Sequence, residues 1–282
     1  MTSLLGQDRT TSLLEISSAP DFFVDVRRLI EGIAASNDEI ELADHLRDIA
    51  TRVGADVSYF MTFVREDRSF DAYRLLQACD PLWGLEYGSA GGYHHDPWLE
   101  HAMDHSEPAR GMEISCTSES QCSVVQLAEK FGFRSVVVVP APAGSGLSRL
   151  GLLVLGSRQP GFYDGDGYAT VKVLVRAVAM ELHERCATFV RRELLADKGI
   201  TPDEIALLCH ERAGRTSKSI ARLMGASPGA IDARFRRLNA KLCSPNRRVS
   251  ASLAAEYGLI QAWRADKLEE HPGATPTRGA GL

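Results

Sequence analysis

The chain has 282 residues, of which 44% are hydrophobic and 24% are charged. This composition is typical of a globular protein and excludes a disordered or collagen-like chain, and the length suits one medium-sized domain and one small domain. The longest apolar runs, at residues 136–139 and 152–155, are far too short to span a membrane. Residues 1–20 show no basic start followed by an apolar run. We therefore expect a cytoplasmic protein without a membrane partner.

The charge is distributed unevenly along the chain. The formal net charge is −5, but residues 200–264 carry eleven Lys and Arg against five Asp and Glu, a net of +6 that leaves −11 for the remainder. A basic module attached to an acidic one is typical of a protein that binds a phosphate backbone with one domain only. A solvated basic surface without a partner has the same charge, so this pattern alone does not decide between the two.

Helices are expected early in the chain, after a flexible leader over residues 1–20. Apolar residues at helical spacing predict a helix over residues 21–35. The tetrapeptide Ser36-x-x-Glu39 is typical of a capping box and predicts a second helix that runs to Val53. Further along, helices are predicted over residues 119–131 and, as a long amphipathic segment, over residues 168–191.

Strands are expected between these helices. Runs rich in β-branched and aromatic residues predict a hairpin with strands at 57–64 and 70–78, and a second strand pair at 135–140 and 149–156. The aromatic stretch 81–108 is predicted to be rich in loops. Helices beside antiparallel strands indicate an α+β fold class, with the sheet of the N-terminal domain (residues 21–191) in an α-β-α sandwich.

The C-terminal part has the spacing of a small all-α helix-turn-helix domain over residues 200–265, after a linker at 192–199 and before a disordered tail at 266–282. Thr201-Pro202-x-Glu204 starts a first helix, a short second helix contains Ile220, and Ser227 caps a third that runs to Leu242. The third helix has a buried stripe and an outer face with arginines, which is able to contact guanine edges or phosphates. The expected DNA-binding residues are Lys218, Ser227, Asp232, Arg236, Arg237 and Lys241.

This C-terminal pattern resembles the DNA-binding domain of LuxR-type transcription regulators. The matching elements are Thr201-Pro202-x-Glu204, Gly214-Arg215-Thr216, Ile220-Ala221, Ser227, Asn239-Ala240-Lys241-Leu242, Asn246-Arg247 and Gly258-Leu259-Ile260. The resemblance implies a homodimer on double-stranded, palindromic operator DNA, with a fourth helix at 248–257 as the dimerisation helix. Ser219 replaces the usual Glu and Ala230-Ile231 the usual Thr-Val, which affects the expected DNA sequence and not the fold.

The N-terminal domain contains Trp83-x-x-x-Tyr87, Tyr93, Asp96-Pro97, Phe131-Gly132-Phe133-Arg134-Ser135 and Pro140. These residues resemble the autoinducer-binding domain of quorum-sensing LuxR proteins, which implies an acyl-homoserine lactone or a similar small amphiphile as ligand. In that interpretation the Trp83 indole donates to the lactone carbonyl, and Asp96, oriented by Tyr87, accepts from the amide N–H. The acyl chain is expected to be lined by Tyr59, Met61, Leu76, Val136, Val138, Leu153 and Leu155. Two alternatives stay open, in which Trp83 and Tyr87 are plain core aromatics and Asp96 is a helix cap.

Two pocket positions depart from the family. Cys79 stands where many members have Tyr, and Val154 where many have Ser or Thr, so two hydrogen-bond donors are missing from the expected ligand-binding set. The second pocket tryptophan of the family has no counterpart in residues 106–118, and Trp98 lies too early. One lost hydrogen bond to a buried group costs about 1–3 kcal/mol. An orphan regulator that binds DNA without a lactone, with its pocket closed or under control of another protein, is the alternative.

The sequence gives little support for disulfides, a metal site or a catalytic site. The six cysteines are widely spaced and form no CxxC, which indicates neither a disulfide framework nor a zinc site. His101 and His105 are able to hold a metal from one helix face, but no third ligand accompanies them in the sequence. We expect no metal, no cofactor and no catalytic residues, since the N-terminal domain has no motif for a nucleophile with its base or for a carboxylate pair.

Overall fold

The computed structural model describes residues 11–64, 73–142, 149–256 and 258–260. The chain divides into two compact units with the boundary between Arg192 and Glu193, and each unit has a hydrophobic core of its own. Among the helices of the described residues, none combines the length and the apolar character that crossing a membrane requires.

The centre of the N-terminal unit is a five-stranded sheet in which every neighbouring pair is antiparallel. The order across the sheet is β2-β1-β5-β4-β3. The strands are β1 (Val57–Val64), β2 (Arg74–Ala78), β3 (Ala109–Arg110), β4 (Ser135–Ala141) and β5 (Arg149–Ser157). The four predicted strands are therefore confirmed, although residues 65–72, with the turn of the first hairpin, and the turn at 143–148 lie outside the described residues. The two-residue strand β3 is too short to show a periodic pattern in the sequence.

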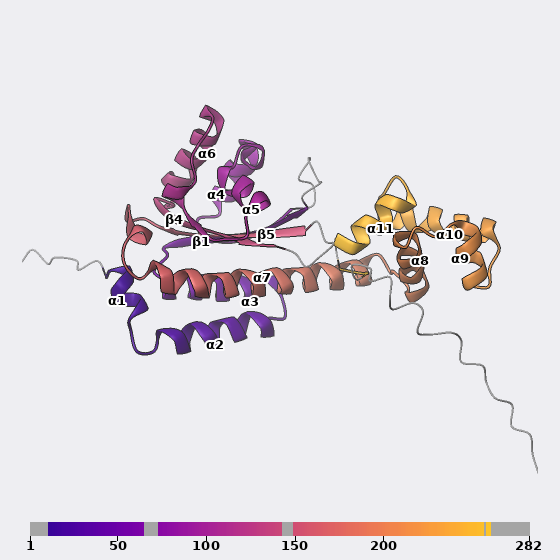
Figure 1. The fold of residues 1–282 in the computed structure, drawn as a ribbon, viewed down its shortest axis with the longest axis horizontal. Helices are drawn as coiled ribbons and strands as arrows, with labels where there is room; N and C mark the ends of the chain where they lie inside the picture. The colour runs from indigo at the N-terminus through magenta and orange to yellow at the C-terminus, as the bar shows by residue number, and fades with distance from the viewer. Residues whose placement is uncertain (1–10, 65–72, 143–148, 257, 261–282) are drawn as a thin grey trace, which may run out of the picture. The chain divides into compact units, whose positions relative to one another are not determined.

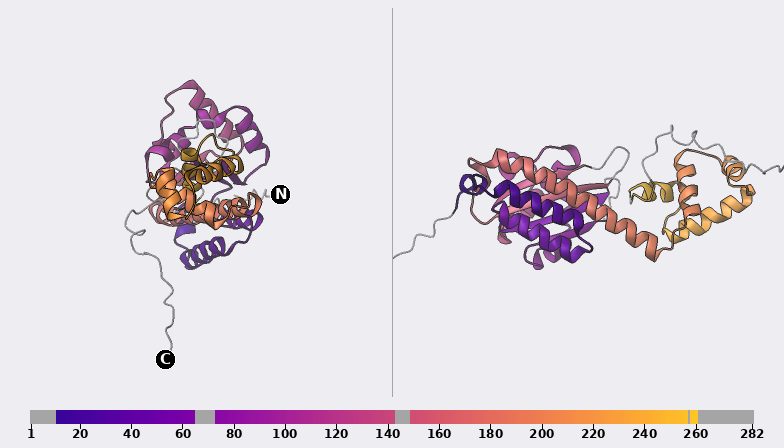
Figure 2. Two further views of the ribbon diagram at one scale, coloured as in Figure 1. Left: turned by 90° about the vertical axis from the view of Figure 1, so that its right-hand side faces the viewer. Right: turned by 90° about the horizontal axis from the view of Figure 1, so that it is seen from below.

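Helices cover both faces of the sheet, as the prediction of an α-β-α sandwich requires (Figure 1). One face packs against α2 (Phe22–Ala35), α3 (Glu39–Arg52) and α7 (Tyr168–Asp197), which lie below the strands in Figure 1 and in front of them in the right-hand view of Figure 2. The other face packs against α4 (Leu82–Ser89), α5 (Pro97–Asp104) and α6 (Glu119–Lys130). A strand covered on both faces buries every side chain, which explains the continuous valine run of β4.

Alternation along each strand sorts the side chains between two separate cores. Phe60, Leu153 and Leu155 belong to the core that faces α2, α3 and α7. Tyr59, Met61 and Val154 belong to the core that faces α4, α5 and α6. The long helix α7 contributes Val171, Val175, Val178 and Leu182 to the first core, at the spacing predicted for an amphipathic helix.

Residues 81–108, expected to be rich in loops, are mostly helical. This stretch contains α4, the 3-10 helix η1 (Gly92–His94) and α5. Two glycines in α4 hide its helical pattern, because glycine is a weak helix former. The start of α5 does carry a signal, since Asp96 is its N-cap and Pro97 occupies the first turn. Two more 3-10 helices, η2 (Gly111–Glu113) and η3 (Phe162–Asp164), complete the unit as described.

Three predicted boundaries also differ from the structure. Residues 11–20 include helix α1 (Leu13–Ser17), which has a capping box and a buried Leu13, so the flexible leader does not extend to residue 20. The N-cap of α3 is Asp38 and not Ser36, because the Asp38 carboxylate accepts from two backbone N–H groups while Ser36 ends α2. The segment 192–199, predicted as a linker, begins as helix because α7 continues to Asp197.

The described C-terminal unit consists of α8 (Pro202–Arg212), α9 (Ser217–Leu223), α10 (Pro228–Lys241) and α11 (Arg247–Glu256). The predicted capping box of Thr201 and Glu204 and the Ser227 cap with Pro228 in the first turn are both confirmed. Ile231, Phe235 and Leu238 form the buried stripe of α10. Residues 266–282, predicted as a disordered tail, lie outside the described residues.

Candidate functional site

Two aromatic residues of α4 mark the candidate site on the second sheet face. Trp83 and Tyr87 lie one helical turn apart, so both face the sheet. Their exposed fractions are 1% and 2%, and the centroids of their rings are 5.1 Å apart. Trp83 and Tyr87 are therefore both buried in the core, and the Tyr87 hydroxyl contacts the carboxylate of Asp96.

Asp96 connects α4 to α5 through both of its carboxylate oxygens. Oδ1 accepts hydrogen bonds from the backbone N–H groups of Trp98 and Leu99 at 2.8 and 3.3 Å, which makes Asp96 the N-cap of α5. Oδ2 accepts from the Tyr87 hydroxyl at 2.8 Å. A carboxylate has about four lone-pair positions, so capping leaves capacity for a further donor.

Burial makes the Asp96 carboxyl group a weaker acid than an exposed aspartic acid. The carboxyl group is 4% exposed, and its desolvation raises the pKa to about 6, against the lowering effect of the Tyr87 hydroxyl and the two backbone N–H groups. Most of the carboxyl groups are ionised at neutral pH as a result. The site therefore presents a negatively charged acceptor among apolar rings, which suits an N–H or O–H donor of a small ligand.

The walls around Trp83 are aromatic. Its ring centroid lies 5.9 Å from Tyr59, 5.8 Å from Phe131 and 5.5 Å from Phe133. Tyr59 comes from β1, whereas Phe131 and Phe133 flank Gly132, which has a φ of 102° directly before β4. Phe131 and Phe133 appear in the sequence only as part of a family motif, and the glycine turn between them is the signal that could have assigned them to the site.

The remaining expected ligand-binding residues lie on the same face. Met61 and Val154 are buried there, and Cys79 is half-buried at its edge. Burial, with the nearby Asp80 carboxylate, raises the pKa of the Cys79 thiol to about 12, so this thiol stays protonated. Val136 and Val138 also face this core.

Three residues expected to line the same chamber do not reach it. Leu153 and Leu155 are buried in the core on the opposite side of the sheet, and Leu76 packs against that core. The expectation is wrong for these leucines because successive side chains of a strand point to opposite faces. Fewer apolar side chains therefore lie on the side of the candidate site than the apolar content of the strands suggests.

A pocket of about 260 Å³ opens beside the aromatic cluster. Trp98, Phe133 and Val136 contribute to its lining, so it adjoins the same core. Trp98 is 3% exposed and its ring centroid lies 6.3 Å from that of Phe133. The structure thus places Trp98 at the site, although its position in the sequence does not match that of the second family tryptophan.

The histidine pair of α5 forms a stack. The rings of His101 and His105 are 4.3 Å apart with an interplanar angle of 8°. Over the described ranges no three His, Cys, Asp or Glu side chains gather in a way that could hold a metal ion.

The residues expected to bind DNA divide into two groups in the C-terminal unit. Lys218, Arg236 and Arg237 are exposed, the arginines on the outer face of α10. The other three residues make contacts within the unit. Ser227 caps α10, Asp232 accepts a hydrogen bond from the Ser217 hydroxyl at 2.6 Å, and Lys241 contacts Glu204 at 2.8 Å and the Gly199 carbonyl at 3.1 Å.

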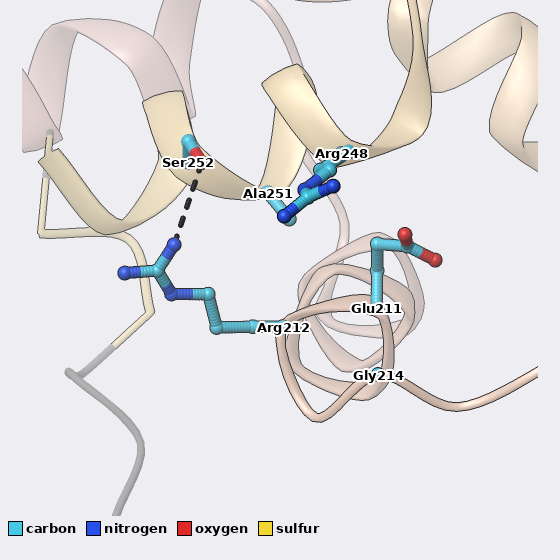
Figure 3. A pocket seen from close by; sticks show the side chains of 6 residues that line it. All are labelled: Glu211, Arg212, Gly214, Arg248, Ala251 and Ser252. Atoms are coloured by element: carbon cyan, nitrogen blue, oxygen red, sulfur yellow. Dashed lines mark hydrogen bonds between the residues drawn. The ribbon is translucent and has the colours of Figure 1, made fainter. Parts of the chain in front are cut away.

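A second pocket, of about 370 Å³, lies between α8 and α11 (Figure 3). Its lining includes Glu211, Arg212, Arg248 and Ser252, and the Arg212 guanidinium donates to the Ser252 hydroxyl at 3.4 Å. Charged and polar side chains of this kind do not suit an apolar ligand, in contrast to the aromatic site of the N-terminal unit.

Comparisons with known proteins bear on the family and the fold of the chain. The sequence model of the family described as the autoinducer binding domain matches residues 38–186. The structure of SdiA in complex with octanoyl-rac-glycerol superposes with a TM-score of 0.62 at 15% identity, over 85% of this chain and 96% of that one. A crystal structure of Escherichia coli SdiA gives the same TM-score of 0.62 at 18% identity, over 85% and 99% of the two chains. At such identities the likeness concerns the fold alone. A search of curated proteins found no match.

Proposed function

Since this chain belongs to the autoinducer-binding family of LuxR-type quorum-sensing regulators, we propose that it is a cytoplasmic transcription regulator controlled by a small amphiphile. In this proposal the N-terminal unit encloses an acyl-homoserine lactone or a related molecule, and the C-terminal unit binds palindromic DNA as a helix-turn-helix homodimer. The observation that carries the ligand part is the buried group of Trp83, Tyr87 and Asp96, in which the Asp96 carboxylate accepts from Tyr87 and the Tyr87 ring packs against Trp83.

The chemistry of this group suits the polar head of such a ligand. The Trp83 indole has one N–H, which supplies a donor to a lactone carbonyl without adding a charge. The Asp96 carboxylate accepts from an amide N–H, and hydrogen bonds to a charged group are worth about 1.5–3 kcal/mol. The Tyr87 hydroxyl already holds Oδ2 at 2.8 Å, so the carboxylate keeps its orientation before a ligand arrives.

Ligand binding would act through stability, because the site lies inside the core between the sheet and α4–α6. A ligand that binds only the folded unit stabilises it by about 2.7 kcal/mol at a concentration one hundred times its Kd. The ligand therefore shifts the population toward the folded, DNA-binding form. No bond is made or broken in this process.

The DNA part of the proposal rests on α10. Arg236 and Arg237 are exposed on the outer face of this helix, in a segment that carries a net charge of +6. Guanidinium groups on such a face are able to pair with guanine edges and phosphates in the major groove. The likeness to SdiA supports the fold of the chain and leaves the DNA sequence open.

Thermal unfolding of the full chain tests the ligand. The protein is heated alone and with N-acyl homoserine lactones of increasing chain length, and with 1-octanoyl-rac-glycerol, the ligand of the similar SdiA structure. We expect the unfolding midpoint to rise with at least one of these amphiphiles in a concentration-dependent manner. No shift with any of them would contradict a ligand-controlled function.

An orphan regulator that binds DNA without a lactone is the second candidate. It is favoured by the packing of Trp83 against Tyr59, Phe131 and Phe133, since side chains of the protein itself fill much of this core. Cys79 and Val154, which lack the donors of many family members, favour it too. Protein that mass spectrometry shows to be free of any amphiphile, and that still folds and binds DNA, would select this candidate.

A further inference from the structure

The hydroxyl of Tyr59 is a buried polar group without a partner. Tyr59 is 1% exposed, and its hydroxyl has no hydrogen bond with any part of the protein that the structure describes. An unpaired buried donor loses its hydrogen bonds to water without replacement, so such groups are uncommon and call for an explanation. An acceptor supplied by a ligand is one such explanation.

The Tyr59 ring lies beside the aromatic residues of the candidate site. Tyr59 lies in β1, opposite Gln77 of β2 and Val154 of β5, and its ring centroid is 5.6 Å from that of Phe133 and 5.9 Å from that of Trp83. Burial raises the pKa of Tyr59 well above its ordinary value, and the negative charge of the nearby Asp96 carboxylate adds to this effect. The hydroxyl therefore remains protonated and available as a donor.

A second unpaired polar atom lies on the same sheet face. Gln77 of β2 is the direct partner of Tyr59 in the β1–β2 pair, and its side-chain oxygen is buried and also lacks a hydrogen bond within the described residues. Tyr59 and Gln77 thus bring an unused donor and an unused acceptor to neighbouring strand positions without pairing with each other. This edge of the core is more polar than a closed apolar core would be, which favours an enclosed polar group.

Tyr59 also lies close to the two positions, Cys79 and Val154, that lack the hydrogen-bond donors of many family members. Val154 has no polar atom and the Cys79 thiol is only a weak donor, so both positions that supply donors in many family members are without a strong one. Val154 is the direct partner of Tyr59 across the β1–β5 pair, and Cys79 follows β2 at the edge of the same core. Val154 in β5 thus offers no donor, whereas Tyr59, its partner in the neighbouring strand β1, offers a hydroxyl.

We propose that the Tyr59 hydroxyl donates a hydrogen bond to the acyl carbonyl oxygen of the bound amphiphile and selects ligands with a carbonyl beside the polar head. This inference rests on the proposed ligand-binding function. It assigns Tyr59 as a specificity-determining residue, with Trp83 and Asp96 holding the head group and Tyr59 holding the start of the acyl chain.

The test compares two full-length variants that each lose one buried hydroxyl. Tyr59→Phe removes the unpaired group, whereas Tyr163→Phe removes a hydroxyl that donates to the Val53 carbonyl at 3.4 Å in the opposite core. Unfolding midpoints are measured without ligand, and calorimetric titration gives the Kd for N-octanoyl homoserine lactone. A second titration pair, 1-octanoyl-rac-glycerol and 1-O-octyl-rac-glycerol, differs only in the carbonyl.

We expect Tyr59→Phe to keep or raise the unfolding midpoint, because no hydrogen bond is lost, and to weaken binding of the lactone about tenfold. Tyr163→Phe lowers the midpoint and leaves the Kd unchanged. The octyl ether, which lacks a carbonyl, binds Tyr59→Phe and the natural chain equally, whereas the octanoyl ester distinguishes them.

Three outcomes decide the matter. If the natural chain binds the lactone and Tyr59→Phe binds it equally well, the inference fails while the proposed function stands. A clear loss of midpoint in Tyr59→Phe without ligand also overturns it, since the hydroxyl then has a partner in the free protein. If the natural chain binds none of these probes, the proposed function fails and the role of Tyr59 fails with it.

Discussion

At the scale of single residues, Asp96 combines two tasks that the sequence presents as alternatives. Its Oδ1 caps α5 and its Oδ2 is held by Tyr87, so the same side chain builds the local fold and presents an acceptor to the site. Retaining a charge in this core has a cost, which is visible in the pKa of about 6. A ligand N–H that donates to the carboxylate reduces this cost.

The raised pKa of Asp96 predicts a pH dependence of stability. Between about pH 4 and pH 6 the folded chain keeps a proton on Asp96 that the unfolded chain has released, so the stabilising contribution of this proton is complete at low pH and is lost as the pH rises through 6. Relative to Asp96→Asn, the natural protein should lose on the order of 3 kcal/mol of unfolding free energy between pH 4 and 7. Denaturant titrations at several pH values measure this difference.

The comparison with Asp96→Asn separates this group from others. Glu107 and Glu113 have lowered pKa values because of Lys172 and Arg110, and their contributions change in the opposite direction below their ordinary pKa. Both are present in the natural protein and in the variant, so they cancel in the difference. Parallel pH profiles of the two proteins would show that burial does not shift Asp96.

Ligand affinity should depend on the same titration of Asp96, but it should rise with pH where the stability falls. An amide N–H binds the ionised carboxylate, so the affinity for N-octanoyl homoserine lactone is expected to rise as the pH is raised from 5 to 7. In Asp96→Asn the affinity is lower, and it is flat over this range. Calorimetric titration at several pH values provides the profile, and a flat profile of the natural chain would contradict the role of the carboxylate.

At the scale of elements, the link between α4 and α5 sets the geometry of the site. The chain passes from α4 through η1 to α5 with Gly92 packed directly against Tyr87. A Cβ at Gly92 would lie 2.6 Å from the Tyr87 ring, whereas a Cβ at Gly88, within α4, would meet nothing within 4 Å. The close approach of η1 thus keeps the Tyr87 hydroxyl on Asp96.

This pair of glycines gives a matched prediction. Gly92→Ala should lower the unfolding free energy by about 1–3 kcal/mol through overpacking, and weaken ligand binding because Tyr87 must move. Gly88→Ala should be neutral or stabilising by up to about 1 kcal/mol, since alanine favours a helix interior. Equal effects of the two variants in chemical denaturation would show that η1 does not position Tyr87.

In the C-terminal unit, we expect the exposed arginines of α10 to contact DNA and Lys241 to contribute to stability. Arg236→Ala is expected to reduce specific DNA binding by about 1–3 kcal/mol or more, because its exposed guanidinium faces outward from the helix. Arg47→Ala, an equal charge change in the N-terminal unit, should leave DNA affinity unchanged. Gel-shift titration at fixed salt on selected binding sequences measures both, and unchanged binding of Arg236→Ala would refute the assignment of α10.

Lys241 is expected to behave differently from Arg236. Its ammonium contacts Glu204 at 2.8 Å, with the two side chains 35% and 16% exposed, and it ties the end of α10 to the start of α8. Lys241→Met should therefore lower the unfolding free energy by about 1 kcal/mol and change DNA affinity little at temperatures where the unit is folded. A large loss of DNA binding by a fully folded variant would show that Lys241 contacts DNA after all.

Some elements of the fold were predictable from the sequence and others were not. The helix α10 was predictable because cap, proline and buried stripe all agree, and β1 because its alternation is strong. The helix α4 was not predictable, because its two glycines weaken the helical pattern. The site was predicted in its three central residues from family spacing, whereas the unpaired hydroxyl of Tyr59 depends on packing between strands that no local pattern records.

At the scale of the whole molecule, the sheet separates a structural core from a candidate ligand core within the N-terminal unit. Polar side chains are buried on both sides of the sheet, but the side under α4–α6 holds the buried Asp96 carboxylate, which accepts from the Tyr87 hydroxyl. In the proposed function, a ligand enclosed on the side of α4–α6 would pack as part of that core. Its binding free energy would then add to the folding free energy of the N-terminal unit.

Calorimetric titration of the full chain with N-octanoyl homoserine lactone at pH 7, for the natural protein and for Asp96→Asn, tests the central claim most directly. The account predicts saturable binding of one molecule per chain to the natural protein, and a loss of about tenfold or more in affinity for Asp96→Asn, because an amide is a weaker acceptor than a carboxylate. Equal affinities of the two proteins, or no saturable binding to the natural chain, would contradict it.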